Sequence, residues 1–199
     1  MKTTGFEFLI DALKSLPGVG KKQAEKIAYF LALKDEQYIK EFTQRINDVH
    51  HKIKFCKQCN NFSTNELCEI CSNQTRLQNK LCVISMIEDL EKIESTNSYI
   101  GLYYVLQGEI DVKNKTKLDQ NIVKKFMDLI QTHKFEEIIL ATDWTINGET
   151  TAIFIKKIIN QLSPNTYVYR LAVGLPINSA LDYADNITLK HAIENKTKY

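Results

Sequence analysis

The amino-acid sequence predicts an α+β protein made of several consecutive parts. Three observations support this fold class: apolar residues recur at helical spacing near the N-terminus, two C-x-x-C pairs follow, and from Leu81 onward short β-branched runs alternate with helical patterns. Because the pattern changes at these points, we expect a helical domain at 1–54, a small cysteine unit at 55–79, an α/β domain at 80–172 and a C-terminal extension at 173–199.

Three helices are predicted in the N-terminal domain. The first begins near Thr3 or Thr4, either of which can serve as N-cap, and its apolar residues recur every three or four positions. The segment LPGVG at 16–20 ends this helix, because one proline and two glycines favour a tight turn. A second helix follows the turn, and the apolar spacing of a third extends over about residues 36–54.

Four cysteines form the most specific chemical pattern in the chain. They make two C-x-x-C pairs on two tight turns: Cys56, Cys59, Cys68 and Cys71. Four thiolates at this spacing suit a tetrahedral zinc ion, whereas a disulfide cluster would require an oxidising compartment. Because four protein ligands leave no position for water or substrate, we expect a small zinc finger with one structural zinc ion per chain.

The composition indicates a protein of the reducing cytoplasm. The N-terminal segment contains charges and lacks the apolar region and cleavage site of a secretory signal, and no apolar run approaches the length of a membrane span. The remaining cysteine, Cys82, lies in the apolar run LCVI and is expected to be a buried core residue. The net charge of +2 is compatible with binding to nucleic acid but does not require it.

Strand patterns and helix patterns alternate through the α/β domain. The strand-like runs are LCVISMI, YYVLQ, EEIILAT and TYVYRLAV, with helical patterns between them. This alternation predicts a mostly parallel sheet covered by helices, and the nearly continuous apolar strands predict burial on both faces. Residues 112–121 are polar and are expected to form a loop, and NITL at 186–189 is expected to form one more short strand.

The segment LPGVGKKQAEKIA resembles the helix-hairpin-helix motif. Gly18 and Gly20 allow the turn to bring free backbone N–H groups at a helix N-terminus against a phosphate. Lys21, Lys22 and Lys26 add positive charge beside that position. Such contacts carry no base information, so DNA binding is expected to be sequence-independent and sensitive to salt. The alternative is a turn used for packing or oligomer contacts, with lysines that are only solvated.

The segment ILATDWTINGETTA resembles part of the Toprim domain of topoisomerases, primases and RecR proteins. Catalytic members bind magnesium with two aspartates in a D-x-D arrangement and with a glutamate on an earlier strand, since carboxylates suit this hard cation. Asp143 matches the first aspartate, but Thr145 stands at the second position. Glu149 matches the acidic residue that follows.

The earlier strand of the Toprim-like domain lacks the catalytic glutamate. Alignment of LCVISMIEDLEKIE places Ser85 at that position, and Asp89 falls at the start of the next helix, where it favours the helix dipole. Two of the carboxylates that catalysis requires are therefore missing, and no catalytic residue is expected. Asp89, Asp143 and Glu149 remain a candidate site for weak Mg²⁺ binding or for contact with a partner.

The order of these motifs along the whole chain resembles the RecR family. The resemblance is carried by LPGVGKKQAEKIA, CKQCNNFSTNELCEIC with the following SNQTR, LCVIS, YYVLQG, ILATDWTINGETTA, and RLAVGLP before LDYADNITL. It implies a non-enzymatic recombination mediator in DNA repair, which acts with RecO and RecF to help load RecA onto single-stranded DNA. It also implies a homo-oligomer, either a dimer or a tetramer, that forms a clamp around DNA, with Lys22 and Lys26 lining the hole. The expected location is the cytoplasm, in association with the nucleoid.

Several positions depart from the pattern of the RecR family. Tyr104 and Gln107 replace a histidine and a glycine, and a polar segment replaces the proline- and glycine-containing loop that follows. The C-terminal extension resembles a Walker-B-like tail that serves oligomerisation, but its acidic residue is missing near Ala180. Two alternatives to the mediator are a Toprim-type metal-dependent DNA enzyme, either a nuclease or primase-like, and a pure assembly module.

Overall fold

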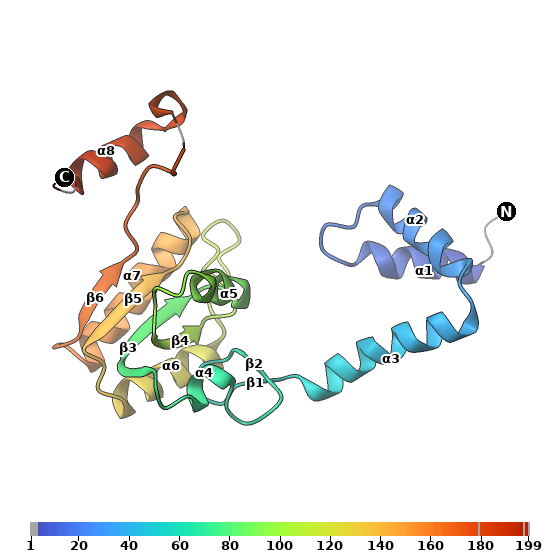
Figure 1. The fold of residues 1–199 in the computed structure, drawn as a ribbon, viewed down its shortest axis with the longest axis horizontal. Coiled ribbons are helices and arrows are strands. Elements are labelled where there is room, and N and C mark those ends of the chain that lie inside the picture. The colour runs from blue at the N-terminus through green and yellow to red at the C-terminus, as the bar shows by residue number, and fades with distance from the viewer. Residues whose placement is uncertain (1–3, 179, 197, 199) are drawn as a thin grey trace. The chain divides into compact units, whose positions relative to one another are not determined.

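A computed structural model describes residues 4–178, 180–196 and 198 of the chain (Figure 1). Its internal contacts divide the chain into two compact units, Met1–Ile53 and Lys54–Tyr199. Within the described residues, no helix combines the length and the apolar character that crossing a membrane requires.

The first unit contains the three predicted helices: α1 (Thr4–Lys14), α2 (Lys21–Ala32) and α3 (Glu36–Lys52). Its small core joins α1 to α2, where Ile10 packs against Ala24 and Ala28. The alanines allow the two helices to approach closely because each projects only a methyl group. Of the two expected N-caps, Thr4 is the first residue of α1, and Thr3 lies outside the described residues.

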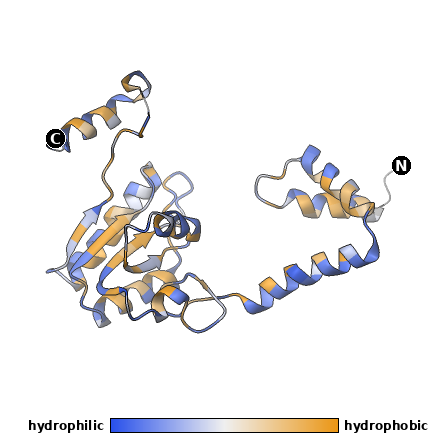
Figure 2. Ribbon diagram, in the orientation of Figure 1, coloured by the Kyte–Doolittle hydropathy of each residue, from blue (hydrophilic) through white to orange (hydrophobic). Residues whose placement is uncertain are grey.

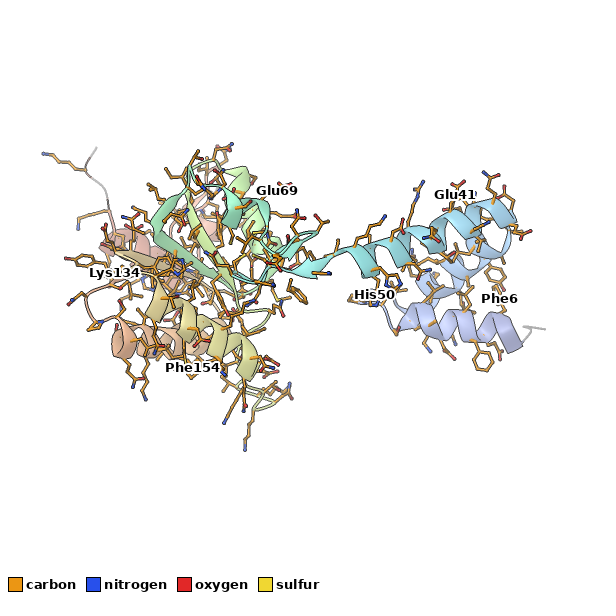
Figure 3. All side chains as sticks on the ribbon, turned by 90° about the horizontal axis from the view of Figure 1, so that it is seen from below. Phe6, Glu41, His50, Glu69, Lys134 and Phe154 are labelled. Carbon is orange, nitrogen blue, oxygen red and sulfur yellow. The ribbon has the colours of Figure 1, made fainter. Side chains whose placement is uncertain are left out.

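Helix α3 is held by its cap rather than by burial. The carboxylate of Asp35 accepts a hydrogen bond from the backbone N–H of Tyr38 at 2.7 Å, which satisfies one of the free donors of the first turn. The helix has no buried residue, and its apolar stripe is 43–57% exposed at Phe42, Ile46 and Val49. His50, labelled in Figure 3, is an exposed residue near the C-terminal end of this helix.

The second unit opens with the cysteine-containing segment. Two short antiparallel strands and one helical turn make up its regular structure: β1 (Lys54–Phe55), β2 (Phe62–Ser63) and α4 (Glu69–Ser72). The rings of Phe55 and Phe62 stack across the two strands with centroids 5.7 Å apart. These two aromatic residues therefore hold the base of the hairpin that presents the first cysteine pair.

A four-stranded sheet follows, and all of its strand pairs are parallel: β3 (Leu77–Ile84), β4 (Gly101–Val105), β5 (Glu137–Ala141) and β6 (Tyr167–Arg170). The spatial order is β4-β3-β5-β6, so β3 lies inside the sheet. The connecting helices are α5 (Ile87–Ser95), α6 (Gln120–Thr132) and α7 (Ile146–Leu162). The predicted strand–helix alternation and parallel sheet are confirmed.

Both faces of the sheet are covered over its central part, whereas Tyr167 and Tyr169 of the edge strand β6 are exposed (Figure 1). On one face, α6 and α7 pack through residues such as Phe126 and Ile155 onto alternate strand residues that include Leu81 and Val83. On the other face, Leu90 of α5 packs against the intervening residues of the strands. Figure 2 shows hydrophobic residues concentrated along these strands. Burial on both faces explains why residues 81–84 of β3 and 102–105 of β4 form continuous apolar runs.

Cys82 is a core residue, as the sequence predicts. It is 2% exposed and belongs to the core beneath α5. Burial raises the pKa of its thiol to about 12, because the thiolate form is poorly solvated there. This cysteine is therefore neutral and unreactive at physiological pH.

The prediction of a strand at 186–189 is wrong. These residues begin α8 (Asn186–Glu194), which follows a short 3₁₀ turn, η1 (Leu181–Tyr183). The carboxylate of Asp185 accepts hydrogen bonds from the backbone N–H groups of Ile187 and Thr188, both at 2.9 Å. This N-cap outweighs the β-propensity of a short run with two β-branched residues, because it satisfies donors that only a helix leaves free.

Candidate functional site

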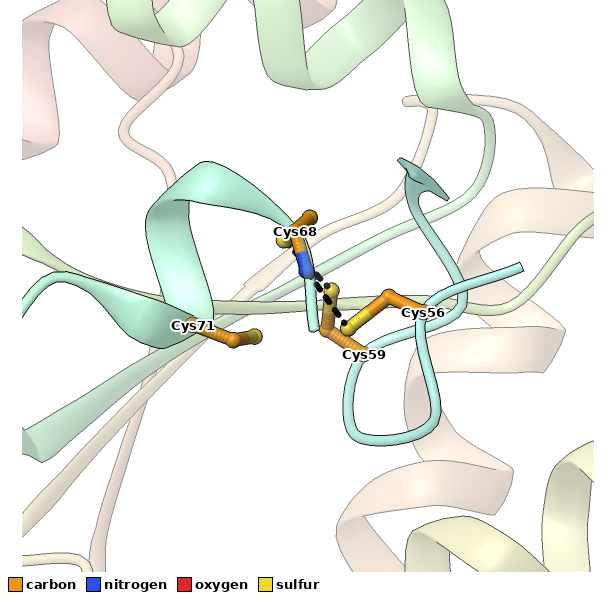
Figure 4. A group of neighbouring side chains, drawn as sticks. All are labelled: Cys56, Cys59, Cys68 and Cys71. Atoms are coloured by element: carbon orange, nitrogen blue, oxygen red, sulfur yellow. Dashed lines mark hydrogen bonds between the residues drawn. The ribbon is translucent and has the colours of Figure 1, made fainter. Parts of the chain in front are cut away.

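The four predicted zinc ligands come together in one cluster (Figure 4). All of their Sγ atoms lie within 4.8 Å of one another, and the Sγ atoms of Cys59 and Cys68 are 3.5 Å apart. Zn–S bonds of about 2.3 Å in a tetrahedron place sulfur atoms about 3.8 Å apart. The four thiols therefore fit a single zinc ion with only small adjustments.

The two C-x-x-C pairs have the same local turn. The backbone N–H of Asn60 donates to the carbonyl of Cys56 at 3.2 Å, and that of Ser72 donates to the carbonyl of Cys68 at 3.0 Å. Asn60 has a φ of 63°, in the left-handed region that asparagine tolerates better than most residues. The two turns aim both cysteines of each pair at the same point.

Hydrogen bonds among the thiols drive their pKa values apart. The pKa of Cys56 is lowered mainly by its neighbour Cys59, and the pKa values of Cys59 and Cys71 are raised mainly by Cys56. The cluster therefore resists the ionisation of all four thiols, since adjacent negative charges repel one another in a site shielded from water. A divalent cation at the centre removes this obstacle, which agrees with a metal site rather than four free thiols.

Lys125 of α6 reaches across to the first cysteine turn. Its Nζ atom donates to the carbonyl oxygen of Cys56 at 2.9 Å and to Oδ1 of Asn60 at 2.6 Å. Asn60, only 4% exposed, in turn donates from Nδ2 to the carbonyl of Val105 in β4 at 3.2 Å. The backbone N–H of Val105 donates to the carbonyl of Cys59 at 2.9 Å. The cysteine unit is thus joined to both a helix and a strand of the α/β domain.

Arg76 joins the second cysteine pair to the same domain. This residue follows α4 and is 12% exposed at its side chain. Its guanidinium group makes two hydrogen bonds to the Glu94 carboxylate, at 2.7 and 2.9 Å, and one to the carbonyl of Gly101 at 2.8 Å. A guanidinium group that makes two parallel hydrogen bonds to one carboxylate restricts both the position and the orientation of Arg76. The cysteine unit is therefore attached to the α/β domain at two separate points.

The predicted phosphate site at the start of α2 has the expected backbone geometry. Gly18 has a φ of +76°, and a Cβ at Gly18 or Gly20 would meet no atom within 4 Å, so the turn is open to solvent. Gly20 is the N-cap and provides no side-chain hydrogen bond, and the first turn contains no acidic residue. Lys21, Lys22 and Lys26 are exposed. An uncapped helix N-terminus beside three cations suits an anion.

The three predicted acidic residues at the Toprim-like edge have separate local roles. Asp89 accepts a hydrogen bond from the backbone N–H of Met86 at 3.0 Å, which caps α5. Glu149 pairs with Arg170 at 3.2 Å, whereas Asp143 is exposed at the end of β5. Among the described residues, the four cysteines are the one group of three or more potential metal ligands that lies close enough together to share an ion.

Glu109 places a carboxylate beside Ser85, the residue that aligns with the catalytic glutamate. Its Oε1 atom accepts hydrogen bonds from Oγ of Ser85 at 2.7 Å and from the backbone N–H of Asp143 at 3.0 Å. A Cβ at Gly148 would lie 2.2 Å from the carbonyl oxygen of Asp143 and 2.8 Å from Glu109 Oε1, so a larger residue does not fit there. Thr145, which replaces the second aspartate, caps α7 by accepting from the Gly148 N–H at 3.0 Å.

Arg170 holds the end of β5 from the other side. Its guanidinium group donates to the backbone carbonyls of Leu140, Thr142 and Asp143 at 2.7–2.9 Å. It also stacks over the Trp144 ring, 4.5 Å from the centroid. These contacts hold the end of β5 in place, while Asp143 is exposed and the side chain of Glu149 is partly exposed.

Sequence reasoning missed Lys125, Asn60, Glu109 and the role of Arg170. Each acts on residues more than twenty positions away, so no local pattern identifies it. One signal was present: an asparagine directly after a C-x-x-C pair is a candidate for the left-handed backbone conformation.

Replacement of one ligand should release the metal. In Cys59→Ser we expect loss of bound zinc and a fall of at least ~5 °C in the thermal midpoint, because the structural metal stabilises the folded chain and about 2 kcal/mol shifts a chain of this size by that amount. Elemental analysis and circular dichroism measure both quantities. Cys82→Ala is the control and should retain zinc; a Cys59→Ser protein with full zinc content would contradict the assignment of the site.

Lys125 should slow the release of zinc. Lys125→Met removes the donor to Oδ1 of the buried Asn60 and one of the two donors to the carbonyl of Cys56, at a cost of about 1–3 kcal/mol. We expect transfer of zinc to a coloured chelator to become several-fold faster. The control is Lys124→Met, which changes the exposed neighbouring lysine. Equal release rates for the two variants would show that the contact does not stabilise the metal site.

Family models match consecutive segments that together cover most of the chain. They describe the RecR helix-hairpin-helix at residues 6–50, the RecR zinc finger domain with four cysteines at 53–73, the Toprim domain at 79–172 and the RecR C-terminal region at 174–197. The four models occur in the order in which the motifs appear in the sequence.

Curated relatives match over almost their full length. A protein named recombination protein RecR from Ureaplasma urealyticum is 44% identical over 197 residues, 99% of this chain and 98% of its own length. Proteins of the same name from Natranaerobius thermophilus and Prochlorococcus marinus are 37% and 34% identical, over 94% and 96% of this chain and 94% of each relative's length. The chain therefore belongs to the RecR family of recombination proteins.

Proposed function

We propose that this chain is a DNA-binding recombination mediator that acts without catalysis, together with RecO and RecF, to help load RecA onto single-stranded DNA. The observation that carries the proposal is the start of α2, where an uncapped helix N-terminus lies beside exposed lysines. Backbone N–H groups and lysine side chains of this kind contact phosphates and not base edges. A mediator requires this property because it must act at any sequence. Its place is the cytoplasm, at the nucleoid.

Self-association into a ring-shaped dimer or tetramer is part of the proposal. Two apolar surfaces support it. The stripe of α3 is exposed, and so are large side chains of the C-terminal extension, with Ile177 at 93% and Tyr183 at 88%. Large apolar side chains that are exposed together favour contact with another protein.

The zinc finger has a structural role in this proposal. Four thiolate ligands complete a tetrahedral site, so the ion has no open position for a substrate. The hydrogen bonds through Lys125 and Arg76 position the unit on the α/β domain. When bound, zinc supplies the positive charge that stabilises four neighbouring thiolates. The protein positions these thiolates relative to the α/β domain.

The Toprim edge supports a binding role. Ser85 and Thr145 replace carboxylates that metal-dependent catalysis uses, and both make structural hydrogen bonds instead. Asp89, Asp143 and Glu149 are proposed as a site for weak Mg²⁺ binding or for a protein partner, with the exposed Asp143 as its accessible member.

Charge reversal at the start of α2 should weaken DNA binding. In Lys22→Glu and Lys26→Glu we expect the affinity for single-stranded DNA to fall about 10-fold at low salt. The plot of the logarithm of the binding constant against the logarithm of the salt concentration has a negative slope. Its magnitude should fall by about 0.7 for each phosphate that the variant no longer binds. Fluorescence anisotropy over a salt series measures both quantities, with light scattering to follow the oligomer.

Lys40→Glu is the matched control, since Lys40 is an exposed lysine of α3 in the same unit. It should change the DNA affinity little. Unchanged affinity and slope in Lys22→Glu and Lys26→Glu, with ring formation intact, would favour the pure assembly module instead.

The enzyme alternative is favoured by one feature, the solvent-exposed carboxylate of Asp143 at the carboxyl end of a parallel strand. We expect no cleavage or synthesis when the protein is incubated with DNA and Mg²⁺ or Mn²⁺, because too few carboxylates are available to hold the ions. Product analysis on denaturing gels tests this. A metal-dependent activity that disappears in Asp143→Ala would establish the enzyme instead of the mediator.

A further inference from the structure

A mostly apolar groove lies on the α6 and α7 side of the second unit. Its volume is about 460 Å³, within the range of roughly 300–1,000 Å³ typical of ligand pockets. Its apolar lining comes from the loop before α6, from α6 and from α7: Ile110, Leu118, Val123, Met127 and Phe154. Phe154, labelled on α7 in Figure 3, is 38% exposed. We call this feature the α6–α7 groove.

The loop that forms one wall of the α6–α7 groove is fixed in place. The backbone N–H of Ile110 donates to Oγ1 of Thr151 at 2.8 Å, and that of Val112 donates to Oδ1 of Asn147 at 3.1 Å. Both acceptors belong to α7. Residues 111 and 116 exchange two backbone hydrogen bonds at 3.0 and 3.1 Å, which closes the loop into a short hairpin. A groove with a fixed wall costs little ordering free energy when it is filled.

The rim of the groove is positively charged. Lys117 and Lys124 are both lining residues, and within the described part of the chain neither forms an ion pair. The loop adds Lys113 and Lys115. The carboxylate of Asp119, which follows the loop, accepts hydrogen bonds from two backbone N–H groups of the first turn of α6 and, among the described residues, forms no ion pair with these lysines.

We propose that the α6–α7 groove is a docking site for an acidic peptide segment of a partner protein. A bulky apolar side chain of that segment fills the groove, and its carboxylates lie against Lys117 and Lys124. The apolar floor suits a bulky apolar side chain, and the cationic rim suits carboxylates, so the groove favours a peptide that has both. The flexible side chain of Met127 allows the floor to adapt to the inserted side chain.

Two other occupants fit less well. Single-stranded nucleic acid binds through several aromatic stacking platforms, and the floor offers one aromatic ring among four aliphatic side chains. The segment LDYAD of a second copy, at residues 181–185, combines an aromatic residue with acids. However, Asp185 is used to cap α8, which leaves a single acidic residue for the rim.

The test uses fluorescence anisotropy with a fluorescein-labelled peptide of sequence DEDLFEDL and the full chain. We expect saturable binding that weakens at least ~10-fold in the double variant Lys117→Glu/Lys124→Glu, equivalent to about one decade in Kd. Binding should also weaken in Phe154→Ala, and for a control peptide in which serine replaces the leucines and phenylalanine.

The matched control is Lys156→Glu/Lys157→Glu, which changes the net charge equally through two exposed lysines of α7 outside the groove. It should retain peptide binding. The proposal is overturned if the peptide does not bind saturably, or if both double variants lose peptide binding equally. It is also overturned if an oligo-dT strand displaces the peptide and if the groove variants lose binding of that strand as well. A groove variant that dissociates the oligomer would assign the groove to a second copy instead.

Discussion

The second unit depends on the burial of β3 on both faces. Its residues 81–84 alternate between the core beneath α6 and α7 and the core beneath α5, and its two neighbours in the sheet are β4 and β5. The apolar area buried along this strand fixes the register of the sheet, because a slip of one residue would exchange the two cores. Ser85, which belongs to the Toprim edge, directly follows β3 and is positioned by this strand.

The cysteine unit depends on its contacts with the α/β domain, and a bound zinc ion would stabilise it further. Its regular structure amounts to two strands of two residues and a single helical turn, too little to bury a core. Two hydrogen-bonded cations, Lys125 and Arg76, connect it to α6, α5 and β4. Lys125 also places a positive charge beside a cluster whose four thiolates would exceed the charge of one zinc ion.

Side-chain hydrogen bonds hold the strand ends at the Toprim edge in place. Glu109 accepts hydrogen bonds from Ser85 and from the backbone N–H of Asp143, and Arg170 donates to the carbonyls of Leu140, Thr142 and Asp143. Gly148 is required because the backbone of Asp143 approaches too closely for any side chain. The side chains and backbone at this edge are therefore fixed by several hydrogen bonds.

The sequence by itself determined the three N-terminal helices, the parallel sheet and the four metal ligands, because each depends on local spacing. The C-terminal strand was predicted wrongly because the cap at Asp185 competes with a weak β pattern. Only the tertiary structure decided how the parts are connected: Lys125 meets the carbonyl of Cys56 across 69 positions, and Glu109 meets Ser85 across 24. Such contacts, like the α6–α7 groove, leave no period in the sequence, since they arise where separate segments pack on a common buried core.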